Sequence, residues 1–411
     1  MTESDSTALR TASRQPGQSA HRVNTSEHPG HSIDPYGLEF SGRGGEFVRV
    51  WIVNVLLTVV TLGFYTPFAR RRTAQYFYSH TLVADSPLEF TAHKRGMVLG
   101  FLLMVLVYAT FKLAADTGQD AAVSLLLLAG AVLAPYLWAS AMRFRLASTR
   151  WRGVRLQFNA GWGEVYKASW PVFAMALAWM AVAASLGALP KPLAPWALLL
   201  PLAALVASLL CVIRLEFNYK SLLVLRARVG SHHGRWKPVY SDFLRIWLAT
   251  LGVFLAGVLL VGALVGLAVG GSLSLLDGMR GKGLAAMLAI AAAVVGAVLG
   301  LFFVSAPARA YREARMHQLV WNNVGVSHIA RFRCDLRAGA YVWLRVKNMV
   351  LSLLTLGFYR PFAMVSEYRM KVESVTLHVK GGVDQLAGQL VEQQGGFGDA
   401  VADAVGLGLV G

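Results

Sequence analysis

Two asparagines, Asn54 and Asn348, are the side chains of this 411-residue sequence best placed to bind a polar ligand, because each lies within an otherwise apolar segment. An amide in an apolar environment needs hydrogen-bond partners. Those partners could belong to a ligand. They could also be the other asparagine or a backbone carbonyl, in which case both residues hold helices together. The residue types alone leave these alternatives open.

Each asparagine precedes a copy of one short phrase. TLGFYTPFA occupies 61–69 and TLGFYRPFA occupies 355–363, with eight of nine positions identical. Glycine relaxes the backbone and proline removes a donor, so Gly-Phe-Tyr-x-Pro predicts a turn or a break. The tyrosines are typical of membrane–water boundaries or could line a polar site. The candidate ligand or packing residues are Asn54, Thr61, Gly63, Tyr65, Pro67, Asn348, Thr355, Gly357, Tyr359 and Pro361.

The sequence contains none of the common signatures of catalysis. There is no G-x-S-x-G, no phosphate-binding P-loop and no H-E-x-x-H. We therefore expect no catalytic residues, no metal site and no cofactor, and the protein is not predicted to be an enzyme. The net charge of +17 is not accompanied by a nucleic-acid recognition motif, so no nucleic-acid partner is predicted.

Long apolar segments dominate the chain, which is 55% hydrophobic and only 15% charged. Runs of about 18 or more apolar residues are long enough to cross a bilayer. Six spanning helices are predicted at roughly 96–114, 121–142, 168–190, 194–214, 246–274 and 283–307. This pattern makes a soluble helical protein an unsatisfactory interpretation.

The basic residues alternate between the two sides that these spans define. Segments 66–95, 143–168, 214–245 and 308–347 carry 26 Lys and Arg residues, whereas loops 112–120, 190–194 and 276–283 carry four. Basic loops remain cytoplasmic during insertion, so the rich segments are predicted to be cytoplasmic. Anionic lipid headgroups are the expected partners of this face, with Arg70, Arg71 and Arg72 as candidate headgroup contacts.

Small residues at four-residue spacing predict close helix packing. They are Gly262, Gly266, Gly270, Gly296 and Gly300. Packing within one chain and formation of a homo-oligomer both fit this pattern.

Short alternating stretches are predicted to form β-structure on the cytoplasmic face. LEFSGRGGEFVRV at 38–50 resembles LQFNAGWGEVYKA at 156–168, with looser copies at 88–100 and 332–344. The expected fold is an all-α polytopic membrane protein with about six core helices, two duplicated membrane-associated or re-entrant helices and these short β elements. Residues 1–36 are predicted to be a disordered cytoplasmic tail, and 37–411 a single membrane domain with an internal repeat at 38–83 and 332–379.

The duplicated segments 46–68 and 339–362 allow two topologies. If both span the membrane, the copies are inverted, as in many secondary transporters. If both enter only partly and return, they lie on the cytoplasmic side in one orientation. The second topology is favoured because it keeps the basic N-terminal region out of the periplasm.

The sequence resembles the YjgN family of bacterial inner-membrane proteins, which contain a domain of unknown function. The resemblance rests on F-x-G-x-G-G-E at 40–46, N-x-L-L-T-x-x-T-L-G-F-Y-x-P-F-A at 54–69, STRWRGVRLQFNAGWGEVY at 148–166 and the C-terminal GDAVADAVGLGL. It covers about 37–411. Phe68 and Phe362 stand where the family usually has tryptophan. The resemblance implies location in the inner membrane and no particular activity.

Two functions are therefore consistent with the sequence. The first is transport or channel-like passage of a small solute, which requires a polar cavity reaching Asn54, Tyr65, Asn348 or Tyr359. The alternative is a membrane scaffold that organises lipid or envelope partners, as the basic face suggests.

Overall fold

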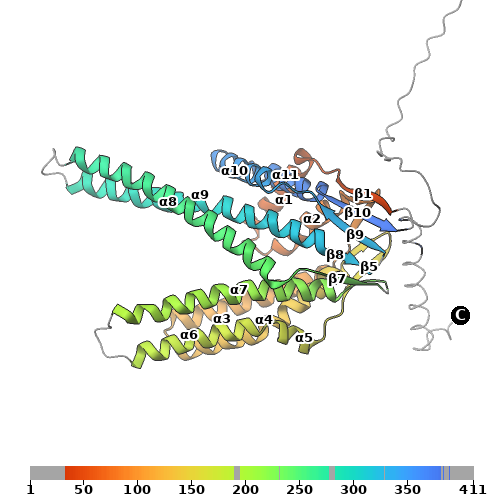
Figure 1. The fold of residues 1–411 in the computed structure, drawn as a ribbon, viewed down its shortest axis with the longest axis horizontal. Helices are drawn as coiled ribbons and strands as arrows, with labels where there is room; N and C mark the ends of the chain where they lie inside the picture. Colours follow the sequence, from red (N-terminus) through yellow and green to blue (C-terminus); the bar gives the residue numbers. More distant parts are fainter. Residues whose placement is uncertain are drawn as a thin grey trace, which may run out of the picture.

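A closed β-barrel with helices on one side of it forms the body of the protein (Figure 1). The computed structural model describes residues 33–188, 195–230, 232–276, 283–327 and 329–380, together with Val383 and Gly388. The expected tail at 1–36 lies mostly outside these residues. Its last four residues are an exception, because strand β1 begins at Ile33.

The barrel has ten antiparallel strands in the described residues, in the order β1-β10-β9-β8-β7-β6-β5-β4-β3-β2, and β2 pairs with β1 to close it. The strands are β1 Ile33–Phe40, β2 Thr81–Val83, β3 Ser86–Phe90, β4 Thr149–Trp151, β5 Val154–Phe158, β6 Ala227–Val229, β7 His232–Trp236, β8 Val324–Val326, β9 Ala330–Cys334 and β10 Val375–Lys380. The first and last strands are neighbours in the barrel, since Ile33 pairs with Lys380.

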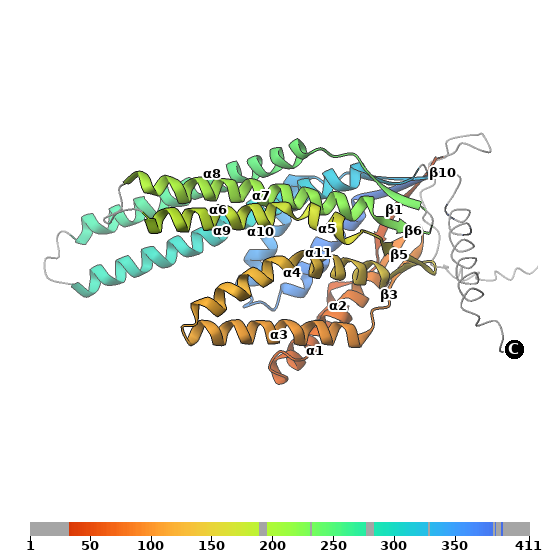
Figure 2. The ribbon, with the colours of Figure 1, turned by 90° about the horizontal axis from the view of Figure 1, so that it is seen from below.

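Five helical hairpins alternate with the strands, and each connects two strands that are neighbours in the barrel. The helices are α1 Gly44–Val60, α2 Thr66–Ser79, α3 Lys94–Asp116, α4 Asp120–Ala147, α5 Trp162–Ala168, α6 Trp170–Ala188, α7 Leu199–Leu225, α8 Tyr240–Leu276, α9 Gly283–Asn323, α10 Ala338–Leu354 and α11 Arg360–Glu373, with a short 3-10 helix at Pro195–Leu198. The remaining connections are tight turns. Connections of an up-and-down barrel alternate between its rims, so all the helices leave from one rim (Figures 1 and 2).

The expectation of an all-α fold is therefore wrong. Short strands were expected within 38–50, 88–100, 156–168 and 332–344, and β1, β3, β5 and β9 begin before these stretches and end inside them. Their partners β2, β4, β6 and β8 have three residues each, which is too short to show alternation. Because every strand finds two neighbours, the short elements close into a barrel that has no open edge.

Strand and helix are joined by the same short connection in all five units. Each longer strand ends at a residue that is followed four positions later by the first residue of a helix; these strand ends are Phe40, Phe90, Phe158, Trp236 and Cys334. In four units the first residue after the strand donates its N–H to the carbonyl of the residue that directly follows the returning helix. The donors are Ser41, Thr91, Asn159 and Asp335, with N–O distances of 2.8–3.0 Å. This bond fixes both helices of a hairpin to the barrel rim.

Apolar side chains fill the inside of the barrel. Val154 and Val379 are completely buried, and Leu38, Trp151 and Leu377 belong to the same cluster. The Trp151 indole N–H donates to the Val83 carbonyl at 3.1 Å, which satisfies the one polar atom of that ring. The barrel is therefore a packed core, and its axis is not a pore in the part of the chain that the structure describes.

Six helices among the described residues are long and apolar enough to cross a membrane, and they correspond to the six predicted spans. They are α3, α4, α6, α7, α8 and α9. The predicted spans for α8 and α9 stop short of the observed helix ends on the barrel side. Helix α8 has 37 residues and α9 has 41. At about 1.5 Å per residue, α9 is roughly 60 Å long, about twice the thickness of a hydrocarbon core.

Helices α8 and α9 pack closely, but most of the predicted glycines do not make that contact. A Cβ on Gly300 would lie 2.3 Å from a methyl carbon of Val261, and a Cβ on Gly257 would lie 2.5 Å from one of Val304. Gly262, Gly266 and Gly296 have open space where a Cβ would point, and the surroundings of Gly270 lie outside the described side chains. Gly257, which was not predicted, therefore takes the place assigned to them.

Candidate functional site

The TLGFY phrase forms a tight turn at the tip of a helical hairpin. Helix α1 ends at Val60. The next residues turn the chain: Leu62 and Gly63 have positive φ values of 49° and 93°, and the Gly63 N–H donates to the Thr58 carbonyl at 2.7 Å. This is the Schellman pattern that ends helices. The Thr61 hydroxyl then accepts a hydrogen bond from the N–H of Tyr65 at 2.9 Å, and Pro67 is the second residue of α2. The phrase specifies a reversal of the chain.

The second copy has the same geometry. Leu356 and Gly357 have φ values of 51° and 92°, the Gly357 N–H donates to Ser352 at 2.6 Å, and the Thr355 hydroxyl accepts from Tyr359 at 3.0 Å. Pro361 lies at the start of α11. Neither 46–68 nor 339–362 is a single helix, and both hairpins return to the barrel rim from which they left.

Asn54 and Asn348 hold the two helices of their own hairpins together. The Asn348 amide donates to the Ser366 hydroxyl and a Glu367 carboxylate oxygen, both at 3.0 Å, and its side chain is 1% exposed. The Asn54 amide donates to the Ala69 carbonyl at 3.3 Å and the Thr73 hydroxyl at 3.4 Å, with 6% exposure. Of the alternatives open from the sequence, the structure places both amides in helix–helix contacts.

The other motif side chains pack locally. Tyr65 stacks on Phe68 and Tyr359 stacks on Phe362, with ring centroids 5.6 and 5.7 Å apart. Of the candidate headgroup contacts, Arg70 is exposed, Arg71 donates to the Ala92 carbonyl at 3.0 Å and Arg72 donates to the Tyr65 hydroxyl at 3.3 Å. Arg71 therefore joins α2 to the connection before α3.

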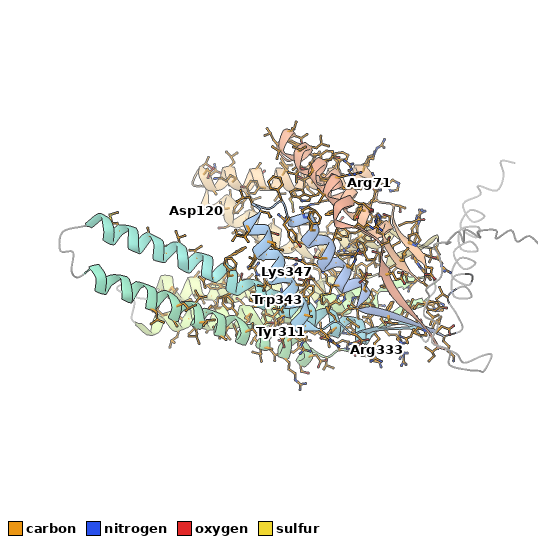
Figure 3. All side chains as sticks on the ribbon, turned by 90° about the horizontal axis from the view of Figure 1, so that it is seen from above. Arg71, Asp120, Tyr311, Arg333, Trp343 and Lys347 are labelled. Carbon is orange, nitrogen blue, oxygen red and sulfur yellow. The ribbon has the colours of Figure 1, made fainter. Side chains whose placement is uncertain are left out.

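A charged cleft of about 460 Å³ lies where α7, α9, α10 and α11 approach one another, on the barrel side of the spans. Its charged lining residues are Glu216, Lys220, Arg309, Arg312, Glu313, Arg345 and Lys371, and His317 is next to them. We call this set the cationic cleft. Figure 3 shows α9 and α10 side by side, with Tyr311 on the first and Trp343 and Lys347 on the second.

Glu216 organises the α7 side of the cationic cleft. Its carboxylate accepts from Lys220 at 2.8 Å, from the Trp247 indole N–H at 2.8 Å and from Arg312 at 3.3 Å. The Arg312 guanidinium also lies over the Trp247 ring, 4.4 Å from its centroid. One carboxylate thus connects α7, α8 and α9 and is shared by two cations.

Glu313 and Glu367 organise the opposite side. Glu313 pairs with Lys371 at 2.7 Å and with Arg345 at 3.6 Å, and Arg345 also binds Glu367. Burial alone would lower the pKa of Arg345, but the charge and hydrogen bond of Glu367 outweigh it and the pKa is raised. The guanidinium is therefore permanently charged.

Positive charge is in excess in this region. Lys220, Arg309, Arg312, Arg345 and Lys371 are five cations, and Glu216, Glu313 and Glu367 are three carboxylates. Arg309 donates to the Ser305 hydroxyl at 3.2 Å, and it forms no ion pair with any carboxylate among the described residues. The paired groups are half-buried and Arg309 is exposed at their edge, and a cluster whose cations outnumber its carboxylates by two favours an anionic ligand.

The cleft lies at the level expected for a membrane–water boundary. From Gly283 to Arg309 helix α9 rises roughly 39 Å, which is enough to cross a hydrocarbon core of about 30 Å. Glu216 lies nine residues before the end of α7, roughly 13 Å from the barrel rim. The aromatic residue Trp247 at the same level is typical of this boundary.

This cleft was not predicted from the sequence. Its charged residues come from four helices, and all of them except Lys371 fell into segments counted only as basic loops. The one local signal was the spacing of Glu216 and Lys220, which four residues separate on one helix face. Among the described residues, no group of three or more His, Cys, Asp or Glu side chains lies close enough to hold a metal ion.

Comparison with known proteins places this architecture in a family. The family model described as "Bacterial protein of unknown function (DUF898)" matches residues 35–404. The chain belongs to the DUF898 family. The match begins in β1 and extends past β10, so it covers the whole barrel and all five hairpins of this DUF898 protein.

Curated relatives match shorter stretches of the DUF898 chain. "Inner membrane protein YjgN" of Escherichia coli K12 is 27% identical over 140 residues, and that of E. coli O157:H7 is 26% identical over 147 residues. The Salmonella typhimurium LT2 protein of the same name is 25% identical over 138 residues. The matched stretch is 34–36% of this chain and of each relative, so the chain spans about a third of the length of these relatives. No solved structure matches the chain.

Proposed function

We propose that this protein is a bacterial inner-membrane protein that binds anionic phospholipid headgroups in the cationic cleft and so organises lipid around it. The excess of cations over carboxylates at the level of the membrane boundary carries the proposal. The names of the curated relatives support the inner membrane as its location. No catalytic step is part of the proposal, and no nucleic-acid partner is invoked.

In this proposal the barrel lies in the cytoplasm. Exposed arginines lie on its strands, among them Arg331 and Arg333 of β9, while Asp116 and Asp120 lie at the opposite end of the α3–α4 hairpin (Figure 3). Basic segments stay on the cytoplasmic side of a membrane. All the tight turns and both ends of every hairpin would then be cytoplasmic, in agreement with the 26 basic residues counted in those segments.

The α1–α2 and α10–α11 hairpins are proposed to enter the cytoplasmic leaflet and return. Their tips are apolar and exposed: Leu62 is 90% exposed and Leu356 is 89% exposed, and Phe64 and Phe358 are next to them. Exposed apolar groups of this size are stabilised by lipid rather than water. Trp343 and Lys347 on the outer face of α10 suit the boundary itself. Both copies of the phrase would then have one orientation.

Solute transport is less well supported than lipid organisation. Transport requires a polar cavity that reaches Asn54, Tyr65, Asn348 or Tyr359. The cationic cleft is lined by other residues. Both asparagines use their amide N–H groups in helix contacts, and the barrel axis is filled. The ion-pair network between α7 and α11 is the observation that keeps transport as a second candidate. Formation of a homo-oligomer stays a prediction.

Replacing Arg309 with glutamine is expected to weaken anionic lipid binding by about tenfold, because one charge-assisted hydrogen bond is lost. Arg309 makes no ion pair among the described residues, so the fold should tolerate the change. Binding of phosphatidylglycerol to detergent-purified protein, measured by native mass spectrometry against phosphatidylcholine, checks this. Arg331→Gln removes the same charge from the outside of the barrel and should leave binding unchanged. Equal loss in both variants would show non-specific attraction and contradict the proposal.

A further inference from the structure

A second hollow adjoins the cationic cleft on its membrane side. It is a groove of about 320 Å³ between α7, α8 and α9, and we call it the apolar groove. Leu209, Ile213, Leu251, Phe254 and Ala308 supply most of its lining. Arg309 and Arg312 line both the apolar groove and the cationic cleft, so the two hollows meet at these guanidinium groups.

The few polar atoms of the groove are already bonded within the protein. The Thr250 hydroxyl donates to the Ile246 carbonyl at 2.8 Å, and the Ser305 hydroxyl donates to the Phe302 carbonyl at 2.8 Å. The Trp247 indole N–H is used by Glu216. Apart from the guanidinium groups of Arg309 and Arg312 at its cleft end, the groove therefore offers an apolar surface, which suits a hydrocarbon chain and not a polar solute.

The direction of the groove matches the direction of a lipid. The apolar groove extends away from the barrel by seven residues on each of two helices, from Arg312 to Ser305 on α9 and from Trp247 to Phe254 on α8. This distance is roughly 10 Å into the membrane layer. The cationic cleft lies on the barrel side of the same arginines. A single molecule with an anionic head and an acyl chain would place its charge beside Arg309 and Arg312 and its chain along Ile213 and Leu251.

We infer that the two hollows form one site for an anionic phospholipid, with the headgroup in the cationic cleft and one acyl chain in the apolar groove. The inference rests on the proposed function, because the headgroup must bind first in the cleft. Beyond the proposed function, it states that the protein recognises the acyl chain of the lipid as well as the charge of its headgroup. The bound lipid would then contact α7, α8 and α9 at once and hold these helices together.

Substitutions that fill the apolar groove distinguish binding of the acyl chain from binding of the headgroup in the cationic cleft. Ala308→Phe places a ring in the groove, and Thr250→Phe does so from α8 if the nearly enclosed Ala308 does not tolerate the change. Affinity is measured by native mass spectrometry for dioleoyl phosphatidylglycerol and for dihexanoyl phosphatidylglycerol, whose short chains cannot extend along the groove. Ala129→Phe, on the exposed surface of α4, is the matched control.

Both groove variants are expected to lose about tenfold or more in affinity for the dioleoyl lipid, the effect of leaving roughly two methylene groups in water. They should bind the dihexanoyl lipid as the unmodified protein does, which also shows that they are folded, and Ala129→Phe should bind both. Unchanged dioleoyl binding would overturn the inference while leaving headgroup binding in place. An equal loss for both lipids would also overturn it, because binding of the dihexanoyl lipid does not depend on the groove. If the unmodified protein binds neither lipid in preference to phosphatidylcholine, the proposed function itself fails.

Discussion

Alanine at position 234 is expected to prevent β7 from packing against α7. A Cβ on Gly234 would lie 2.0 Å from the backbone carbonyl oxygen of Val224, in the last turn of α7. Neither atom can turn away, because one belongs to the helix backbone and the other is fixed by the pairing of Gly234 with Val326. Overpacking of this kind costs about 3 kcal/mol or more when only backbone can move. We expect Gly234→Ala to aggregate or to unfold at a much lower temperature in detergent.

Gly37 provides the matched control for this substitution. It lies in β1 of the same barrel, pairs with Thr376, and has nothing within 4 Å of the position of a Cβ. Alanine there should leave the melting temperature unchanged or raise it slightly, since glycine weakens a strand interior. Similar melting temperatures for Gly37→Ala and Gly234→Ala, measured by thermal unfolding in the same detergent, would contradict the close helix–barrel packing.

Leucine at position 348 is expected to be the most damaging change in either TLGFY hairpin. It keeps the branched shape of Asn348 but removes the hydrogen bonds to Ser366 and Glu367, and it leaves those groups without a buried partner. A loss of this type costs about 2 kcal/mol. The variant should melt at a lower temperature, and α10 and α11 should become accessible to protease before the rest of the protein.

The corresponding change in the other hairpin should be milder. The bonds of Asn54 are longer, at 3.3 and 3.4 Å, and neither partner is charged. Asn159→Leu is the control, because Asn159 is exposed on the connection after β5. We expect destabilisation in the order Asn348→Leu, Asn54→Leu, Asn159→Leu. If Asn348→Leu melts with the unmodified protein while a bound solute is lost, the asparagine is a ligand contact and not a helix contact.

Local sequence patterns were sufficient for the helices and for the turns. Runs of apolar residues located all six long helices, because a spanning segment must be apolar along its whole length. Gly63 and Pro67 were read as marks of a break, and they form the turn between α1 and α2. The phrase occurs near both ends of the chain because two hairpins make the same reversal, each with an asparagine that bonds to the returning helix.

The barrel could not be predicted in the same way, because its closure depends on contacts distant in the sequence. β1 pairs with β10 across more than three hundred residues, and four strands have only three residues each. The cationic cleft shares this difficulty: Glu216 meets Arg312, and Glu313 meets Lys371, only after the barrel has placed α7, α9 and α11 on one rim. Counting basic residues per segment pointed to the barrel side of the spans but not to the individual residues of the cleft.

The position of a bound headgroup is the most direct test of the proposed lipid site. Phosphatidylglycerol with a photoreactive diazirine in its headgroup can be added to the purified protein in mixed micelles, cross-linked by light and mapped by peptide mass spectrometry. We expect adducts on the cleft-lining stretches of α7, α9 and α11 around Lys220, Arg309 and Lys371, and their suppression by unlabelled phosphatidylglycerol. Adducts spread along the exposed surfaces of α3, α4 and α6, with none in the cationic cleft, would contradict the proposal.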